Sequence, residues 1–223
     1  MRALIIGAAC VLACSARAGA QQPYGGTATP QAGALEAGGS VSYIQGYDAG
    51  SRPAQETSNS TTGAPPLTLF ATSSRVAPSI GAEARLGVYL TGRVSVEGTL
   101  QFSRPALRTR ISDDFENAAP LTAEETATSY VVTGSLLYHF GNGPVSPFVS
   151  GGGGYVRQLH EDNTEVVTGT EFHGGGGVNV WLGSARRLAV RLDAQASSRS
   201  RSVGFEDKRQ LLATVGGGVS FRF

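Results

Sequence analysis

Apolar and polar residues alternate along most of the chain beyond residue 34. In the stretch 79–89, Ile80, Leu86 and Val88 occupy even positions, whereas Glu83 and Arg85 occupy odd positions. Successive side chains of a β-strand point to opposite faces, so this pattern predicts a strand with one apolar and one polar face. The alternation as a whole predicts an all-β protein.

Eight segments fit this interpretation. They span residues 35–44, 79–89, 93–102, 129–140, 147–157, 171–182, 188–196 and 211–223. Two of them contain runs of four glycines, at 151–154 and 174–177, and their faces cannot be assigned from the pattern. A phosphate-binding loop would require a following helix, but no helical periodicity and no Gly-Lys-Ser follows either run. Both segments are therefore interpreted as strands in which small residues make room for bulky neighbours.

The connections between these segments alternate in length. Residues 91–92, 141–146 and 183–187 form short breaks, and residues 45–74, 103–125, 158–170 and 198–208 form long ones. An up-and-down meander places all short turns at one end and all long loops at the other, as in outer membrane barrels. We therefore expect an eight-stranded antiparallel up-and-down transmembrane β-barrel over residues 35–223. The first long loop is rich in Ser, Thr, Gly and Pro, which predicts a mobile segment.

The alternative is a soluble β-protein whose apolar faces meet in a core, because alternation alone does not fix the direction of the faces. Aromatic residues near the strand ends favour the membrane barrel, since an interfacial girdle would lie there. These residues are Tyr89, Phe102, Tyr138, Phe140, Phe221 and Phe223.

Residues 1–20 have the features of a secretory signal peptide. Arg2 precedes an apolar stretch over residues 3–13, and residues 18–20, Ala-Gly-Ala, have the small-x-small form of a signal-peptidase site. Residues 21–34 would then form a short periplasmic segment. In the alternative interpretation, Val-Leu-Ala-Cys at 11–14 resembles a bacterial lipobox, and Cys14 becomes a lipidated N-terminus. Both cysteines of the chain lie in the signal segment, so no disulfide is expected.

Composition and charge exclude several classes of protein. The chain has 18 basic and 17 acidic residues, and this balance lacks the basic excess of a nucleic-acid-binding protein. With 40% apolar and 16% charged residues it is not a disordered chain. After residue 20, no apolar run approaches the ~20 residues of a membrane-spanning helix. Its 31 glycines are about twice the ordinary frequency, without the triplet period of collagen.

The polar faces of the predicted strands carry charges of both signs. Eight strands enclose a lumen that side chains just about fill, and an isolated charge buried there would be costly. We therefore expect a network of ion pairs across the lumen, with His139 on the same face. Its predicted members are Glu36, Glu83, Arg85, Arg93, Glu97, Arg191, Asp193 and Arg222. The network either plugs the barrel or lines a gated narrow pore for small solutes.

Three features resemble the OmpA-like family of eight-stranded outer membrane barrels. The chain ends in alternating apolar residues up to Phe221 and Phe223, which looks like the assembly signal of such barrels. Residues 146–155, Ser-Pro-Phe-Val-Ser-Gly-Gly-Gly-Gly-Tyr, and residues 191–193, Arg-Leu-Asp, are similar to strand motifs of this family. The resemblance implies a monomer in the bacterial outer membrane, assembled by the barrel-assembly machinery and surrounded by lipid and lipopolysaccharide. No peptidoglycan-binding domain follows the barrel, so a tethering role is not implied.

The sequence contains no convincing catalytic or metal-binding motif. A nucleophile elbow of the Gly-x-Ser-x-Gly type is absent, and the spacing of His160, Asp162 and His173 matches no standard ligand pattern. We expect no enzymatic activity, cofactor or metal, and a structural or surface-interaction role; a lipid-modifying envelope enzyme is the least favoured alternative. Rim cations can pair with lipopolysaccharide phosphates or with neighbouring acidic loops. They comprise Arg104, Arg108 and Arg110 in the second long loop, and Arg199, Arg201, Lys208 and Arg209 in the fourth.

Overall fold

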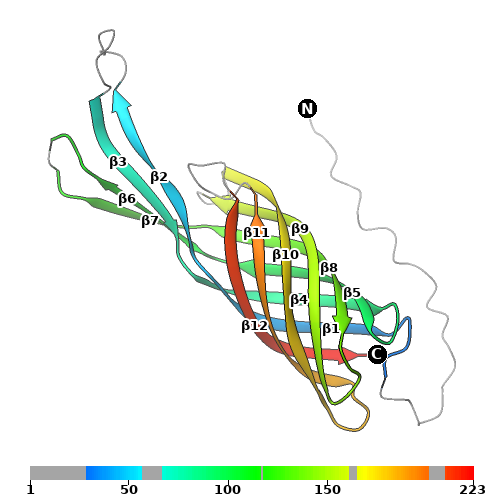
Figure 1. Ribbon diagram of the computed structural model, residues 1–223. Coiled ribbons are helices and arrows are strands. Elements are labelled where there is room, and N and C mark those ends of the chain that lie inside the picture. Colours follow the sequence, from blue (N-terminus) through cyan, green and yellow to red (C-terminus); the bar gives the residue numbers. More distant parts are fainter. Residues whose placement is uncertain (1–28, 57–66, 117, 161–164, 201–208) are drawn as a thin grey trace.

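The computed structural model describes residues 29–56, 67–116, 118–160, 165–200 and 209–223. Eight antiparallel strands form a closed barrel in the order β1-β12-β11-β10-β9-β8-β5-β4 (Figure 1). Their bounds are β1 Leu35–Ile44, β4 Ser79–Tyr89, β5 Val94–Ser103, β8 Thr128–His139, β9 Val145–His160, β10 Glu165–Leu182, β11 Leu188–Arg199 and β12 Gln210–Arg222. The predicted fold class is therefore confirmed, and each predicted segment corresponds to one barrel strand.

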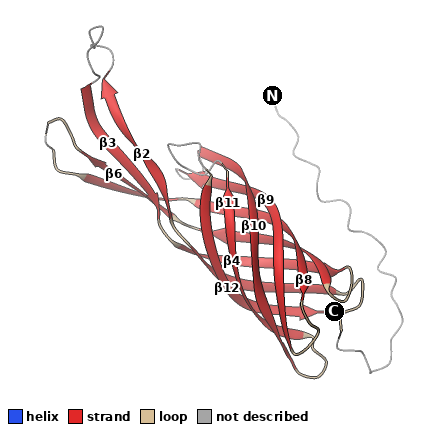
Figure 2. Cartoon of the chain, viewed as in Figure 1, coloured by secondary structure: helices blue, strands red, loops and turns tan. Residues whose placement is uncertain are grey.

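The barrel closes where the first and last strands meet. β1 pairs with β12 on one side, where Glu36 lies opposite Arg222, and with β4 on the other, where Leu35 lies opposite Val88. Closure leaves no barrel strand with an unpaired edge, which is the condition for a sheet that spans a lipid bilayer. Figure 2 shows that strands dominate the described chain. No helix long and apolar enough to cross a membrane occurs among the described residues.

Apolar side chains cover the outside of the barrel and polar ones fill the inside. Ile80 is 71% exposed and Leu211 77%, whereas Arg85 is 6% and Arg191 4% exposed. This arrangement is the reverse of a soluble protein and is stable only when acyl chains cover the outer wall. Of the aromatic residues expected in the girdle, Tyr89 is the exception, because its side chain is buried in the lumen.

The faces of the glycine-rich strands β9 and β10 are decided by close contacts between backbones. A Cβ atom on Gly152 would lie 2.1 Å from the carbonyl oxygen of Gly134, and one on Gly154 would lie 2.0 Å from that of Val132. A Cβ on Gly151 would meet only the carbonyl oxygen of His173, at 4.0 Å. The packing therefore requires glycine at 152 and 154, and in β10 also at 175, 176 and 177, whereas Gly151 has room for a side chain. Bulky residues of these strands, such as the buried Trp181, fill the lumen space that the glycines leave.

Beyond the long-loop end of the barrel, four further strands form a second sheet. β2 (Tyr47–Glu56), β3 (Leu67–Val76), β6 (Ala106–Ser112) and β7 (Leu121–Thr126) pair in the order β2-β3-β6-β7 and project away from the barrel (Figure 1). The prediction of irregular loops over 45–74 and 103–125 is therefore wrong for most of these residues. We call this element the external sheet. It forms because two hairpins far apart in sequence pair through β3 and β6, a partnership that no local pattern reveals.

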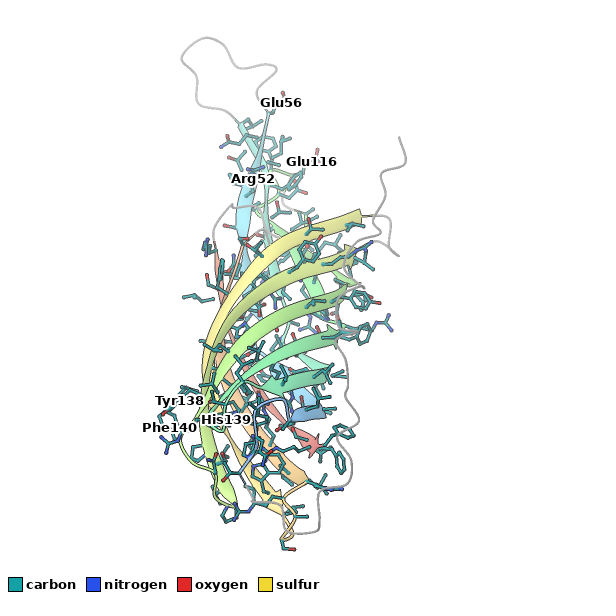
Figure 3. All side chains as sticks on the ribbon, turned by 90° about the vertical axis from the view of Figure 1, so that its right-hand side faces the viewer. Arg52, Glu56, Glu116, Tyr138, His139 and Phe140 are labelled. Carbon is teal, nitrogen blue, oxygen red and sulfur yellow. The ribbon has the colours of Figure 1, made fainter. Side chains whose placement is uncertain are left out.

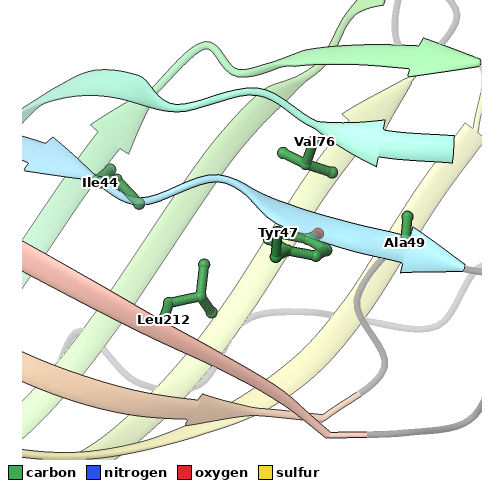
Figure 4. Close-up of a cluster of buried hydrophobic side chains, with 5 residues drawn as sticks. All are labelled: Ile44, Tyr47, Ala49, Val76 and Leu212. Carbon is green, nitrogen blue, oxygen red and sulfur yellow. The ribbon is translucent and has the colours of Figure 1, made fainter.

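A small apolar cluster joins the external sheet to the barrel. It contains Ile44, Tyr47, Ala49, Val76 and Leu212, with Leu107 packed against it. Figure 4 shows five of these side chains converging from β1, β2, β3 and β12. Because they come from both sheets and bury apolar surface together, they hold the external sheet on the barrel mouth.

The short-turn end carries both ends of the described barrel chain. Gly33 donates its backbone N–H to the carbonyl oxygen of Tyr89 at 2.7 Å, and Phe223 donates to that of Leu35 at 2.9 Å. The predicted signal peptide over 1–20, Cys14 and most of the predicted periplasmic segment lie outside the described residues. The side chains of His160 and Asp162 lie outside them as well.

Candidate functional site

Arg191 and Glu97 form an ion pair that crosses the lumen. Arg191 belongs to β11 and Glu97 to β5, four places apart in the barrel order, so the pair connects opposite walls. Arg191 Nη1 donates to Glu97 Oε2 at 2.7 Å and Nη2 donates to Oε1 at 3.1 Å. The ring of Phe148 lies 4.4 Å from the guanidinium carbon of Arg191. A bidentate charge-assisted contact with an aromatic support holds the arginine in one orientation.

A second arginine shares the carboxylates beside this pair. Arg85 Nη1 lies 3.2 Å from Asp193 Oδ1 and 3.8 Å from Glu83 Oε2. Arg191 Nε also lies 3.3 Å from Asp193 Oδ1, so Asp193 bridges the two guanidinium groups. Glu83 in addition accepts hydrogen bonds from Ser40 Oγ at 3.0 Å and Gln101 Nε2 at 2.8 Å. These two donors help to stabilise the Glu83 carboxylate, because Arg85 lies farther from Glu83 than from Asp193.

At the short-turn end, Arg222 is held between two aromatic rings. Its guanidinium carbon lies 3.7 Å from the Trp181 ring centroid and 4.7 Å from that of Tyr89. Arg222 Nη2 donates to the Tyr89 hydroxyl at 2.7 Å and lies 3.4 Å from Glu36 Oε2, while the Tyr89 hydroxyl donates to Glu36 Oε2 at 3.0 Å. These residues come from β12, β10, β4 and β1, so the cluster ties the barrel seam together.

Sequence reasoning missed the ion pair at the opposite end of the lumen. Arg199 Nε and Nη2 donate to Glu171 Oε2 at 2.9 and 2.6 Å, and both side chains are buried. We expected Arg199 in a rim loop, but β11 continues to that residue and turns its side chain inward. Glu171 was missed because it lies in the glycine-rich strand β10, whose two faces could not be assigned from the sequence. The alternation of Asp193, Gln195 and Ser197 continues to Arg199 and could have identified it.

Two Ser–His pairs also lie in the lumen. Ser95 Oγ lies 3.0 Å from His139 Nε2, and Ser135 Oγ lies 2.8 Å from His173 Nε2. A hydrolytic triad needs an acid at the second ring nitrogen, but His173 Nδ1 has no hydrogen-bond partner among the described residues. The part of the chain that the structure describes also contains no cluster of three or more metal-ligating side chains. The pairs are suited to satisfying buried polar atoms.

Of the eight residues predicted to form the lumen network, the structure brings Glu36, Glu83, Arg85, Glu97, Arg191, Asp193 and Arg222 into ion pairs inside the barrel. Arg93 does not join them. It is exposed in the turn between β4 and β5, where its carbonyl oxygen accepts the backbone N–H of His139. The predicted strand began one residue too early, and the turn aims this side chain away from the lumen.

The space left among these side chains is small. A cavity of about 30 Å³ lies beside Arg85, Asp193 and His173, and another of about 10 Å³ lies beside Tyr89 and His139. A single water needs on the order of 10–15 Å³ on this measure. The larger cavity therefore has room for one or two waters, and Arg85 Nε and Nη2, which have no hydrogen-bond partner among the described residues, are suited to bind them.

The charges of the external sheet are partly paired with each other. Arg108 Nε lies 3.0 Å from Glu124 Oε2, and both side chains are more than half exposed. The acidic partner of this arginine comes from the same predicted loop, 103–125, and not from a neighbouring one. Exposed pairs of this kind add little to stability, about 0–1 kcal/mol.

A closed barrel with an apolar outer wall and an ion-paired lumen defines an integral β-barrel membrane protein. Residues 6–223 match the family of outer membrane protein β-barrel domains, and the chain belongs to this family. It is accordingly a protein of the bacterial outer membrane. No curated protein matches the sequence.

Solved structures agree on the fold. The outer membrane protein OprG from Pseudomonas aeruginosa is similar with a TM-score of 0.54 at 10% identity, covering 88% of this chain and 98% of OprG. Neisserial surface protein A is similar with a TM-score of 0.51 at 11% identity, covering 85% of this chain and 97% of that protein. At such low identity, the likeness concerns the barrel architecture alone.

Proposed function

We propose that this protein is a non-conducting barrel that anchors the external sheet above the outer leaflet, with a structural and surface-interaction role. The observation that carries this proposal is the set of ion pairs across the lumen. Arg191 and Glu97 join opposite walls, and the cavities beside them have volumes of about 30 and 10 Å³. Volumes of this size suit single waters and are too small for a solute, which supports a closed lumen.

The external sheet supports the surface-interaction part of the proposal. Its strands are paired over most of their length, and the apolar cluster around Tyr47 and Val76 fixes it to the barrel. A preorganised sheet presents side chains to a partner at a lower entropic cost than a loop that must order on binding.

Single-channel recording in planar bilayers tests the closed lumen. We expect no conductance steps from the wild-type protein. The variant E97A/R191A removes the cross-wall pair and is expected to conduct, which shows that the assay detects inserted barrels. Steps from the wild-type protein would refute the closed lumen and favour the second candidate function, a narrow pore for small solutes. The observation that supports a pore is the polar lining of the lumen.

We further propose that the protein is a monomer without enzymatic activity. Barrel closure leaves no barrel strand edge for pairing with a second copy, and the Ser–His pairs lie inside the lumen, away from membrane lipid. Light scattering of the protein in detergent tests the first statement. Comparison of lipid A masses from cells with wild-type protein and with a S135A/S95A variant tests the second, with identical profiles expected.

A further inference from the structure

Four exposed arginines line the outer wall just above the membrane-facing band. Arg104 follows β5, Arg108 and Arg110 belong to β6, and Arg75 belongs to the adjacent strand β3. We call these four residues the arginine column. They face outward because the residues next to them are covered: Pro105 is buried, Val76 belongs to the apolar cluster and Leu107 packs against it.

The column begins where the apolar band ends. Phe102 is the outward residue that precedes Arg104, and its ring lies 5.3 Å from that of Tyr130 on β8. Outward aromatic rings of this kind mark the membrane interface of a barrel. At about 3.3 Å per residue, the backbone from Arg104 to Arg110 extends about 20 Å along the chain, and its rise above that level is smaller because barrel strands are tilted. The column therefore spans the headgroup layer of the outer leaflet.

The arrangement of the column is unfavourable within the protein itself. Arg75 lies directly opposite Arg108 in the β3–β6 register, with Arg110 on the same face of β6. Like charges at directly opposite positions of adjacent strands destabilise a sheet. Glu124 offsets Arg108 alone, and among the described residues Arg75, Arg104 and Arg110 form no ion pair. The external sheet thus carries repulsion that an anionic partner would relieve.

We propose that the arginine column binds the phosphate groups of the phosphorylated glycolipid of the outer leaflet, lipopolysaccharide. Its acyl chains would lie against Phe102 and the apolar wall below, which places its phosphates at Arg104 and its charged sugars beside Arg75 and Arg110. Guanidinium groups match phosphate oxygens in a bidentate fashion, and arginine is suited to this contact. The inference goes beyond the proposed function, since it concerns the outer wall and holds whether or not the lumen conducts.

Native mass spectrometry of the protein in zwitterionic detergent tests the proposal, with bisphosphorylated lipid A as the probe. The variant R75Q/R104Q/R110Q removes the column charges that have no carboxylate partner. At about 1 kcal/mol for each arginine near an anionic lipid surface, we expect lipid binding to weaken on the order of a hundredfold. Wild-type affinity in this variant would overturn the proposal.

A control variant with the same loss of charge is R52Q/R93Q/R187Q. Arg52 is exposed on β2 (Figure 3), where it lies opposite Thr72, whereas Arg110 lies opposite the next residue, Ser73, so Arg52 and the column belong to different faces of the external sheet. Arg93 and Arg187 are exposed at the short-turn end of the barrel. We expect this variant to bind lipid A as the wild type does; an equal loss would reveal general charge attraction and refute a defined column. Equal binding of dephosphorylated lipid A by the wild type, or displacement by millimolar inorganic phosphate, would also refute a lipid phosphate site. A shift on boiling in SDS gels verifies that every variant is a folded barrel.

Discussion

Ser135 Oγ and His173 Nε2 lie 2.8 Å apart although a complete strand separates them. Ser135 is on β8 and His173 on β10, and Gly152 of β9 lies opposite both in the register. The hydrogen bond passes over Gly152 because that residue has no side chain. A glycine in the barrel wall thus permits a hydrogen bond between β8 and β10, two strands that are not adjacent in the sheet, and this bond stabilises the barrel.

Gly152→Ala is expected to destabilise the barrel. The added Cβ would lie 2.1 Å from the carbonyl oxygen of Gly134, so backbone must move and the Ser135–His173 contact is lost. We expect a decrease of about 1–3 kcal/mol in the free energy of unfolding, measured by urea titration in detergent micelles. The matched control is the neighbouring Gly151→Ala, whose Cβ meets no atom closer than 4.0 Å and should leave stability unchanged. Equal effects in the two variants would contradict this account of the glycine run.

Arg191→Met is expected to leave the Glu97 carboxylate buried without its main partner. Removal of one member of a buried ion pair costs about 3–5 kcal/mol, whereas the double variant E97Q/R191M removes the stranded charge and should recover part of this loss. A double-mutant cycle on unfolding free energies measures the coupling. Arg108→Met, which breaks the exposed pair with Glu124, is the control and should cost at most about 1 kcal/mol. Additive effects of the two lumen substitutions would show that the pair does not act as a unit.

Arg222→Gln is expected to loosen the seam of the barrel. It removes the cation from between the Trp181 and Tyr89 rings, and a desolvated contact of this kind contributes about 2 kcal/mol. Trp181 is the only tryptophan of the chain, so its fluorescence reports on this site directly during unfolding. Arg209→Gln, which removes a 5.8 Å contact with the Phe172 ring, serves as the control and should change stability by less than about 1 kcal/mol. An unfolding midpoint of R222Q equal to that of the wild type would contradict a role in closure.

Phe223→Ala is expected to impair assembly in cells more than stability. Phe223 is 72% exposed, and the centroid of its ring lies 5.0 Å from that of Phe221 in an edge-to-face arrangement. If the terminal residues form an assembly signal, the amount of heat-modifiable protein in the outer membrane should fall severalfold, while refolding in detergent stays unchanged. Phe140, another exposed aromatic at the short-turn end, supplies the control Phe140→Ala. Normal assembly of F223A would refute the signal.

The sequence by itself determined the barrel strands and their order along the chain, because strand alternation is a local property. The polar positions of Glu83, Arg85 and Arg191 followed from a period of two, and the lengths of the connections indicated a meander. Alternation did not fix which face meets lipid; the aromatic residues near the strand ends, such as Phe102 and Phe221, indicated that the apolar face is the outer one.

Only the tertiary structure decided which polar groups meet. Arg191 finds Glu97 because β11 and β5 lie on opposite walls of a closed cylinder, and closure is not visible in any one segment. The faces of β9 and β10 depend on how closely neighbouring backbones approach Gly152, a residue without a side chain to show its direction. The external sheet depends on pairing between β3 and β6, which are distant in sequence. Arg93 leaves the lumen because a turn ends one residue later than the alternation predicts. Each of these is a relation between segments, and a local pattern carries no information about it until the chain is folded.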